Sequence, residues 1–292
     1  MDIAVKGHNI RKKFGKEGIL DGITLEVQEK EITLLMGPNG VGKTVLLCCL
    51  AGGLKKFEGT VRIFGKPPEE MTSELSPLLQ GSMAVPNLTG QENIAFYSRL
   101  HPKATTHWKE IVKVLELEGD MDKLVKHCSG GMKRKIELAI ALSVDVPLYF
   151  LDEPTVELDL SMIRKLHNLF LEEKERGKTF LITSHNPIDA EVADRILFLQ
   201  EKGIVATGSP NDLLEDVPPV VRIMRSTAKA SQQMGEYLIE GQTFERGGEV
   251  RGFLKEGIDV NQIKEALPEF TGSIERDEVS WTDMFNYYRN LV

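Results

Sequence analysis

The sequence contains few cysteines and has no excess of positive charge. Only three of its 292 residues are cysteines. Two of these, Cys48 and Cys49, are adjacent, which excludes a disulfide framework and favours a reducing compartment. The 36 Lys and Arg residues are outnumbered by 44 Asp and Glu residues, so the formal net charge is -8. Proteins that hold nucleic acid by bulk electrostatics carry the opposite sign, so we expect no nucleic-acid partner.

Long hydrophobic runs are missing as well. The most apolar stretch, residues 138–151, is interrupted by Asp145 and Pro147. It falls short of the roughly 20 residues that a membrane-spanning helix requires. No apolar segment follows the charged residues Asp2 and Lys6, so we expect no signal peptide. We therefore expect a globular protein that reaches a membrane only through a partner.

The chain does contain an alternation of short apolar runs with helical patterns. The buried-strand patterns lie at residues 32–36, 149–151 and 179–183, and the helical patterns lie at residues 45–50, 132–143 and 161–176. Such an alternation predicts an α/β fold, in which right-handed crossovers connect the strands of a parallel sheet. Three more short strands, at residues 60–64, 195–199 and 204–207, predict an antiparallel side sheet.

The pattern of polar and apolar residues changes after about residue 212, where Pro210, Pro218 and Pro219 punctuate the chain. We therefore predict two domains, residues 1–212 and residues 213–292. The second is predicted to be a small α+β module. Its predicted strands cover residues 237–244 and 249–254, and its predicted helices cover residues 260–267 and 281–291.

A glycine-rich segment between the predicted strand at residues 32–36 and the predicted helix at residues 45–50 matches the phosphate-binding pattern G-x-x-x-x-G-K-[ST]. In such a loop, backbone N–H groups and the positive end of the following helix surround the phosphates. The lysine adds a point charge at the β- and γ-phosphates, and the last hydroxyl reaches Mg²⁺. The predicted nucleotide-binding residues are therefore Gly37, Pro38, Asn39, Gly40, Val41, Gly42, Lys43, Thr44 and Val45.

Two adjacent carboxylates, Asp152 and Glu153, follow a second apolar strand. Because side chains alternate along a strand, these two should point in opposite directions and have different tasks. Asp152 fits the Walker B position that holds the shell of Mg²⁺, and Glu153 fits a base that polarises an attacking water.

The five residues Cys128-Ser129-Gly130-Gly131-Met132 resemble the LSGGQ signature of the ATP-binding-cassette (ABC) ATPases, and the resemblance covers about residues 3–210. Ser129 and the N–H groups of Gly130 and Gly131 open a helix, which makes a second phosphate site. In this family the signature of one subunit closes over the ATP that the other subunit holds. The resemblance thus implies ATP as cofactor and a head-to-tail dimer, either a homodimer or a heterodimer with a related cassette.

The resemblance assigns four further positions. Phe14 stands where the family stacks an aromatic ring on adenine, with an ordinary core aromatic as the alternative. Gln80 matches the Q-loop glutamine that touches Mg²⁺ and water, and Asp159 matches the D-loop aspartate. His185 matches the switch histidine at the γ-phosphate. The implied catalytic residues are Lys43, Gln80, Glu153 and His185, and the implied metal-binding residues are Thr44, Gln80 and Asp152.

The chain also departs from the family pattern. Met132 replaces the usual glutamine, and the D-loop carries Glu157 before Leu158, which leaves the dimer contacts there open. An SGGM signature followed by a basic run at residues 133–135 is similar to the subgroup that drives ABC-2-type exporters. The basic run itself is expected to be a solvated face.

The resemblance implies an α/β fold with a P-loop NTPase (RecA-like) core. An antiparallel β side sheet, a helical signature subdomain at about residues 86–142 and a small C-terminal α+β domain are expected to complete it. The implied function is ATP hydrolysis that drives a separate membrane permease, in an exporter, from the cytoplasmic face of the membrane. The alternative is a soluble ABC ATPase that acts as an assembly, translation or regulatory factor without a permease.

Overall fold

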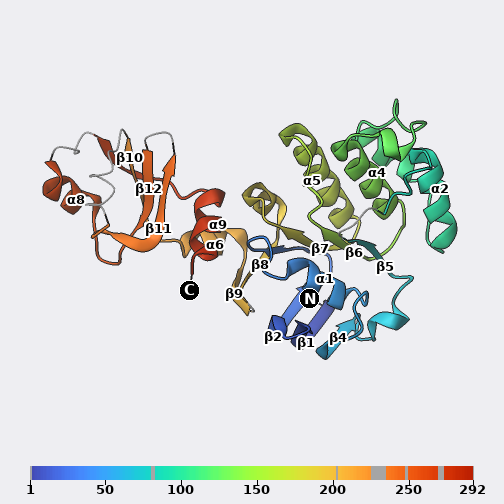
Figure 1. The fold of residues 1–292 in the computed structure, drawn as a ribbon, viewed down its shortest axis with the longest axis horizontal. Helices are drawn as coiled ribbons and strands as arrows, with labels where there is room; N and C mark the ends of the chain where they lie inside the picture. The colour runs from blue at the N-terminus through green and yellow to red at the C-terminus, as the bar shows by residue number, and fades with distance from the viewer. Residues whose placement is uncertain are drawn as a thin grey trace. The chain divides into compact units, whose positions relative to one another are not determined.

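The computed structural model describes residues 2–79, 83–201, 203–224, 235–246, 249–268 and 273–291. The chain divides into two compact units, Met1–Thr207 and Gly208–Val292 (Figure 1). The boundary predicted after residue 212 falls inside helix α6 (Pro210–Glu215). Helix α6 belongs to the second unit because Leu213 is buried and its carbonyl accepts a hydrogen bond from the Tyr288 hydroxyl (3.2 Å).

A six-stranded sheet forms the centre of the first unit. Its order is β5 (Leu75–Leu78), β6 (Leu148–Asp152), β7 (Thr179–Ser184), β3 (Ile32–Met36), β8 (Arg195–Gln200) and β9 (Gly203–Gly208). The strands from β5 to β8 pair in parallel. Every residue of β3, β6 and β7 is buried, as expected for parallel strands covered on both faces. The predicted α/β core is therefore confirmed.

Two of the strands expected in the antiparallel side sheet lie elsewhere. Residues 195–199 and 204–207 form β8 and β9 of the central sheet, and β8 runs parallel to β3. The physical reason is burial: Ile196, Leu197, Phe198 and Leu199 are all buried, so this strand needs cover on both faces. The side sheet contains instead β2 (Glu17–Gln28), β1 (Ile3–Phe14) and β4 (Glu58–Ile63) in that order, with antiparallel pairing.

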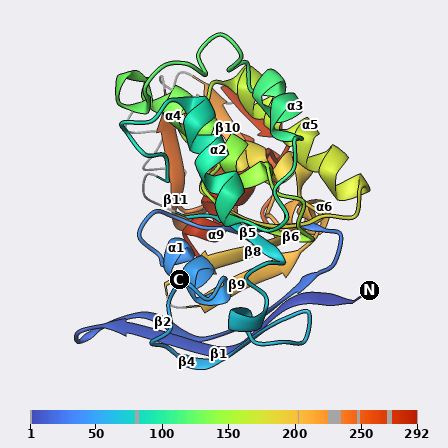
Figure 2. The ribbon, with the colours of Figure 1, turned by 90° about the vertical axis from the view of Figure 1, so that its right-hand side faces the viewer.

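Helices lie on both sides of the central sheet. Helix α1 (Lys43–Leu50) packs between the central sheet and the side sheet, while the four helices that follow gather on the opposite side (Figure 2). These four are α2 (Gly90–Leu100), α3 (Trp108–Val114), α4 (Gly130–Leu142) and α5 (Leu160–Glu175). Short 3-10 helices cover Pro68–Glu70, Val125–His127 and Pro187–Val192. No helix within the described residues is both long enough and apolar enough to span a membrane.

Within its described residues the second unit contains an antiparallel sheet and three helices, the first of which is α6. The strand order is β11 (Leu238–Arg246), β12 (Glu249–Leu254), β10 (Val220–Met224) and β13 (Ile274–Asp277). Helices α8 (Val260–Ala266) and α9 (Trp281–Arg289) follow β12 and β13. Val221, Ile223 and Ile263 are fully buried in its core. The sequence reading missed β10 and β13, because strands of four or five residues give little periodic signal.

A candidate nucleotide site

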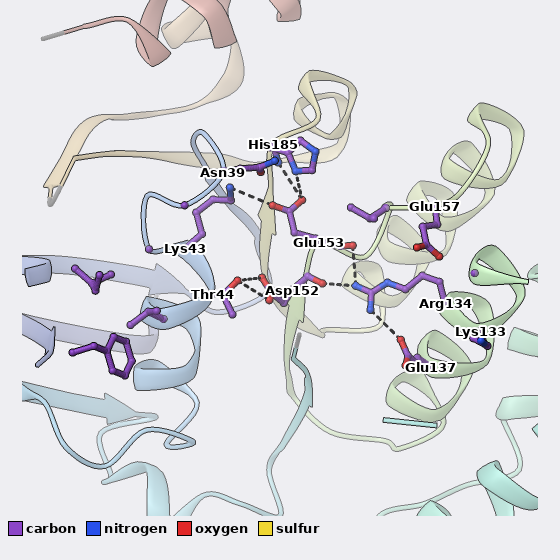
Figure 3. A pocket seen from close by; sticks show the side chains of 17 residues that line it. Asn39, Lys43, Thr44, Lys133, Arg134, Glu137, Asp152, Glu153, Glu157 and His185 are labelled. Atoms are coloured by element: carbon purple, nitrogen blue, oxygen red, sulfur yellow. Dashed lines mark hydrogen bonds and ion pairs between the residues drawn. The ribbon is translucent and has the colours of Figure 1, made fainter. Parts of the chain in front are cut away.

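A cavity of about 950 Å³ lies at the carboxyl ends of the parallel strands, where open α/β sheets bind their ligands. The phosphate loop, the end of β6, the start of α4 and the residue after β7 all contribute to its lining (Figure 3). Of the predicted site residues it brings together Phe14, Asn39, Gly40, Gly42, Lys43, Thr44, Val45, Gly130, Asp152, Glu153 and His185. Gly37, Pro38, Val41, Ser129 and Gly131 adjoin this lining in sequence without being part of it.

The phosphate loop folds around its own lysine. The Lys43 ammonium donates hydrogen bonds to the carbonyls of Gly37 (2.8 Å) and Pro38 (3.1 Å). A Cβ at Gly37 would lie 2.1 Å from the Leu199 carbonyl oxygen, and Gly42 has φ 106°, so glycine is required at both positions. No described side chain caps helix α1. Its first N–H groups are therefore available to an anion.

Asp152 is one of the buried residues that line the site. Its carboxylate is 2% exposed and accepts hydrogen bonds from the hydroxyls of Thr44 (2.8 Å) and Thr183 (2.5 Å). Burial, and after it the charge of Asp152, raises the pKa of the nearby Cys48 thiol. A carboxylate and a hydroxyl in contact are oxygen donors of the kind that Mg²⁺ prefers, so these residues fit the expected ion.

Glu153 has other partners than Asp152, although it lies just beyond the end of β6, where strand alternation no longer applies. One of its carboxylate oxygens lies 3.2 Å from the Lys43 ammonium, and the other lies 2.8 Å from Nδ1 of His185. The backbone has φ 49° at Glu153, an uncommon conformation for a residue with a side chain. Lys43, Glu153 and His185 thus form a continuous chain of polar contacts across the cavity (Figure 3).

A buried polar cluster also forms close in sequence to Glu153 and His185, and it was not identified from the sequence. Asp189 is 2% exposed and accepts hydrogen bonds from the hydroxyls of Thr155 (2.9 Å) and Ser184 (2.5 Å). Its other oxygen lies 2.8 Å from Nε2 of His167. The cluster joins the turn after Glu153, the end of β7 and helix α5. No motif connects these positions, so only the fold reveals them.

The signature residues open helix α4. The Ser129 hydroxyl caps the helix by accepting a hydrogen bond from the Met132 N–H (3.3 Å). A Cβ at Gly130 would lie 2.2 Å from a carboxylate oxygen of Glu157, and a Cβ at Gly131 would lie 2.8 Å from its carbonyl oxygen. The two glycines therefore allow the D-loop to approach the helix closely.

The remaining predicted residues have more varied positions. Phe14 is 51% exposed and lines the cavity, so the alternative of a core aromatic is wrong. The Lys12 ammonium lies 4.8 Å from its ring centroid. Asp159 caps helix α5 by accepting a hydrogen bond from the Met162 N–H (2.9 Å). Gln80 lies outside the described residues.

The basic run of residues 133–135 is not the solvated face that we expected. Lys133 and Arg134 line the cavity, and the Arg134 side chain is only 13% exposed. The reason is the orientation of helix α4, which turns Arg134 toward the end of β6, where it donates a hydrogen bond to the Glu153 carbonyl (2.8 Å).

A phosphate loop between a buried parallel strand and a helix, with acidic residues at the end of a neighbouring strand, defines the class of P-loop nucleoside triphosphatases. Residues 20–156 match the family model described as ABC transporter. The chain is 33% identical over 216 residues to the fluoroquinolones export ATP-binding protein of Mycobacterium tuberculosis, covering 72% of each chain. It is also 33% identical to the Nod factor export ATP-binding protein I of Burkholderia lata, covering 71% of each chain.

Solved structures give the same result. The dimeric structure of a bacterial ABC transporter cassette matches with a TM-score of 0.65 and 25% identity, over 70% of this chain and 98% of that one. A dimeric cassette bound to ADP and Pi matches with a TM-score of 0.64 and 27% identity, over the same shares. The chain belongs to the ATP-binding subunits of ABC transporters. It is an ATPase of that family, whose members form dimeric cassettes and work with membrane permeases.

Proposed function

We propose that this chain hydrolyses ATP with Mg²⁺ as the motor subunit of an exporter. The observation that carries the proposal is the chain of Lys43, Glu153 and His185 across the cavity, with Lys43 to Glu153 at 3.2 Å and Glu153 to His185 at 2.8 Å. A cation for phosphate, a carboxylate for water and an imidazole for the γ-phosphate are the groups that such a hydrolysis needs. The adenine ring stacks on the exposed face of Phe14.

The phosphates of ATP compete with Glu153 for the Lys43 ammonium. When the β- and γ-phosphates take that ammonium, the Glu153 carboxylate is left to accept a hydrogen bond from a water and to orient it for in-line attack. His185 holds the other oxygen of this carboxylate and reaches the γ-phosphate. Thr44 and Asp152, and by the family resemblance Gln80, would hold Mg²⁺, which would supply positive charge at the phosphates.

The dimer completes the site. Ser129, Gly130 and Gly131 of one subunit close over the γ-phosphate that the phosphate loop of the other subunit holds. Either a homodimer or a heterodimer with a related cassette meets this requirement.

The direction of transport is proposed from the two relatives named above, because both carry export in their names. The partner is a separate integral membrane permease, which places this subunit at the cytoplasmic face of the membrane. Helix α2 offers a docking surface, since Phe96 is 43% exposed and Leu100 is 66% exposed.

The catalytic assignment is tested with Glu153→Gln. We expect ATP turnover to fall by about 100-fold or more, since a positioned base contributes factors of this order, and we expect ATP to trap a dimer that elutes early in size-exclusion chromatography. Glu175→Gln, an exposed carboxylate at the end of α5, is the matched control. Turnover at the wild-type rate in Glu153→Gln contradicts the assignment.

The permease is tested by affinity purification of the Glu153→Gln chain with ATP from gently solubilised native membranes. A polytopic membrane protein recovered in near-equal amount supports the transporter. Recovery of soluble complexes alone, with the same result from the cytosolic extract, overturns the permease and favours a soluble ABC ATPase.

A further inference from the structure

Arg134 differs from the two lysines beside it in what it contacts. Its guanidinium donates hydrogen bonds to the carbonyl oxygens of both Asp152 and Glu153, the latter at 2.8 Å. These are the main-chain groups of the two acidic residues at the end of β6 (Figure 3). Nη2 of the planar guanidinium reaches both carbonyls while Nη1 faces Glu137, a fixed arrangement of donors that a lysine ammonium on a flexible stem lacks.

The backbone of Glu153, which Arg134 contacts, has an unusual conformation. Glu153 has φ 49°, and its N–H donates to the hydroxyl (2.9 Å) and the carbonyl (3.1 Å) of Thr183. Its main chain is therefore fixed from β7 on the N–H side and from Arg134 on the carbonyl side. A residue in a sparsely populated φ region persists when its surroundings hold it there.

Glu137 holds Arg134 in turn. One Glu137 oxygen pairs with the Arg134 guanidinium (3.2 Å), and the other accepts a hydrogen bond from the Met83 N–H (3.1 Å). Glu137 is 6% exposed, so the pair is shielded from water and screened little by salt. Met83 begins the described segment that leads into helix α2. A line of contacts therefore runs from Met83 through Glu137 and Arg134 to Glu153.

We propose that Arg134 is a positioning residue for ATP hydrolysis. It holds the Glu153 main chain so that the carboxylate faces Lys43 and His185, and Glu137 keeps the guanidinium in place. The signature helix thereby contacts the main chain of Glu153, the catalytic residue of its own subunit, in addition to the phosphate of the partner's nucleotide. This inference rests on the proposed role of Glu153.

The test separates kcat from KM in Arg134→Gln and Arg134→Lys. We expect kcat to fall by about tenfold to 100-fold in Arg134→Gln, because a misplaced catalytic group costs factors of this order, while KM for ATP stays within about twofold. Arg134→Lys should recover part of kcat, since an ammonium can bond one of the two carbonyls. Lys135→Gln, in the same basic run, is the matched control and should keep wild-type values.

Glu137→Gln gives a second variant that leaves Arg134 intact. The new amide can still accept from Met83 but no longer pairs with the guanidinium, so we expect a smaller fall in kcat, about threefold to tenfold. The double variant Arg134→Gln/Glu137→Gln should match Arg134→Gln alone, because both changes break the same line of contacts. If the fall in kcat of the double variant is instead the product of the two single falls, Glu137 acts separately from Arg134. That result overturns the line of contacts.

Two outcomes overturn the role of Arg134 itself. Unchanged kcat in Arg134→Gln removes it as a positioning residue, and a raised KM at unchanged kcat makes Arg134 a direct nucleotide contact. Glu153→Gln, measured in parallel, distinguishes the two levels of the argument. If Glu153→Gln is inactive while Arg134→Gln is normal, only the positioning role fails. If Glu153→Gln is active, the proposed catalytic assignment fails first.

Discussion

Helix α1 of the ATP-binding unit and helix α9 of the second unit begin in opposite ways. Helix α1 follows Gly42 without a capping side chain among the described residues, and the hydroxyl of Thr44 is engaged by Asp152 instead. Helix α9 begins with a capping box in which Ser280 accepts from the Asp283 N–H (3.2 Å) and Asp283 accepts from the Ser280 N–H (2.8 Å). Arg251 then binds both Asp283 oxygens at 2.7 Å.

The difference shows what each helix end is for. The first N–H groups of any helix need acceptors, and α9 finds them within its own unit, where they add stability. Helix α1 leaves them to a ligand and keeps a buried ammonium, Lys43, beside them. The same backbone N–H groups thus form a binding site in the first unit and a stabilising helix cap in the second.

The largest expected effect comes from removing the Lys43 ammonium at the uncapped N-terminus of helix α1. Lys43→Ala should lower ATP turnover by about 100-fold or more, because a preorganised donor at a developing charge has an effect of this size. It should also weaken binding of a fluorescent ATP analogue. Lys55→Ala, an exposed lysine, is the control. Binding within a few-fold of wild type would show that the ammonium serves the loop rather than the phosphate.

At the capped N-terminus of helix α9 the expected effect is on stability. Arg251→Met leaves the Asp283 carboxylate, 2% exposed, without its charged partner, and breaking such a pair costs about 3 kcal/mol of unfolding free energy. Urea unfolding followed by Trp281 fluorescence in a Trp108→Phe background measures it. Arg276→Met, on the exposed side of β13, should change stability little, and an equal loss there would remove the special role of Arg251.

The same pair predicts a pH dependence. Burial raises the pKa of Asp283, but hydrogen bonds from Arg251 and Ser280 outweigh it and the net pKa is lowered. A lowered carboxylate pKa contributes stability that is complete above the unfolded value near 3.9 and is lost as the pH falls through the folded value. The stability difference between wild type and Arg251→Met should therefore shrink below about pH 4. A difference that is constant with pH would contradict this account.

Much of the nucleotide site could be predicted from the sequence. The residues that hold the site residues in place could not. The phosphate loop and the acidic pair are contiguous residues between periodic segments, so spacing alone locates them. Asp189, His167 and Arg134 meet their partners only through the fold, and their residue types in the chain show no spacing signal. Periodicity also cannot separate parallel from antiparallel strands, which is why β8 and β9 were expected in the side sheet.

Substitutions at the signature glycines should lower stability by less, and the two glycines should differ from each other. A Cβ at Gly131 meets the Glu157 carbonyl at 2.8 Å, whereas a Cβ at Gly130 meets the movable Glu157 carboxylate at 2.2 Å. Gly131→Ala should therefore cost about 1–3 kcal/mol of unfolding free energy, as overpacking does, and Gly130→Ala less. Adding Glu157→Ala should restore Gly130→Ala and leave Gly131→Ala unchanged. Gly119→Ala, open among the described residues, is the control, and equal losses in all three would remove the contrast.

Helix α4 stands between the two cases, because its N-terminus is capped and is also expected to meet a phosphate. Ser129→Ala removes the cap on the Met132 N–H and should cost about 1 kcal/mol, the smallest of these effects. Ser129→Asp retains an acceptor and should keep the stability. Its charge, however, faces the phosphate of the partner's nucleotide, so the ATP-trapped dimer of Glu153→Gln should be lost. Urea unfolding and size-exclusion chromatography measure the two effects separately. A Ser129→Asp chain that still dimerises with ATP would mean that α4, like α9, uses its first turn for stability alone.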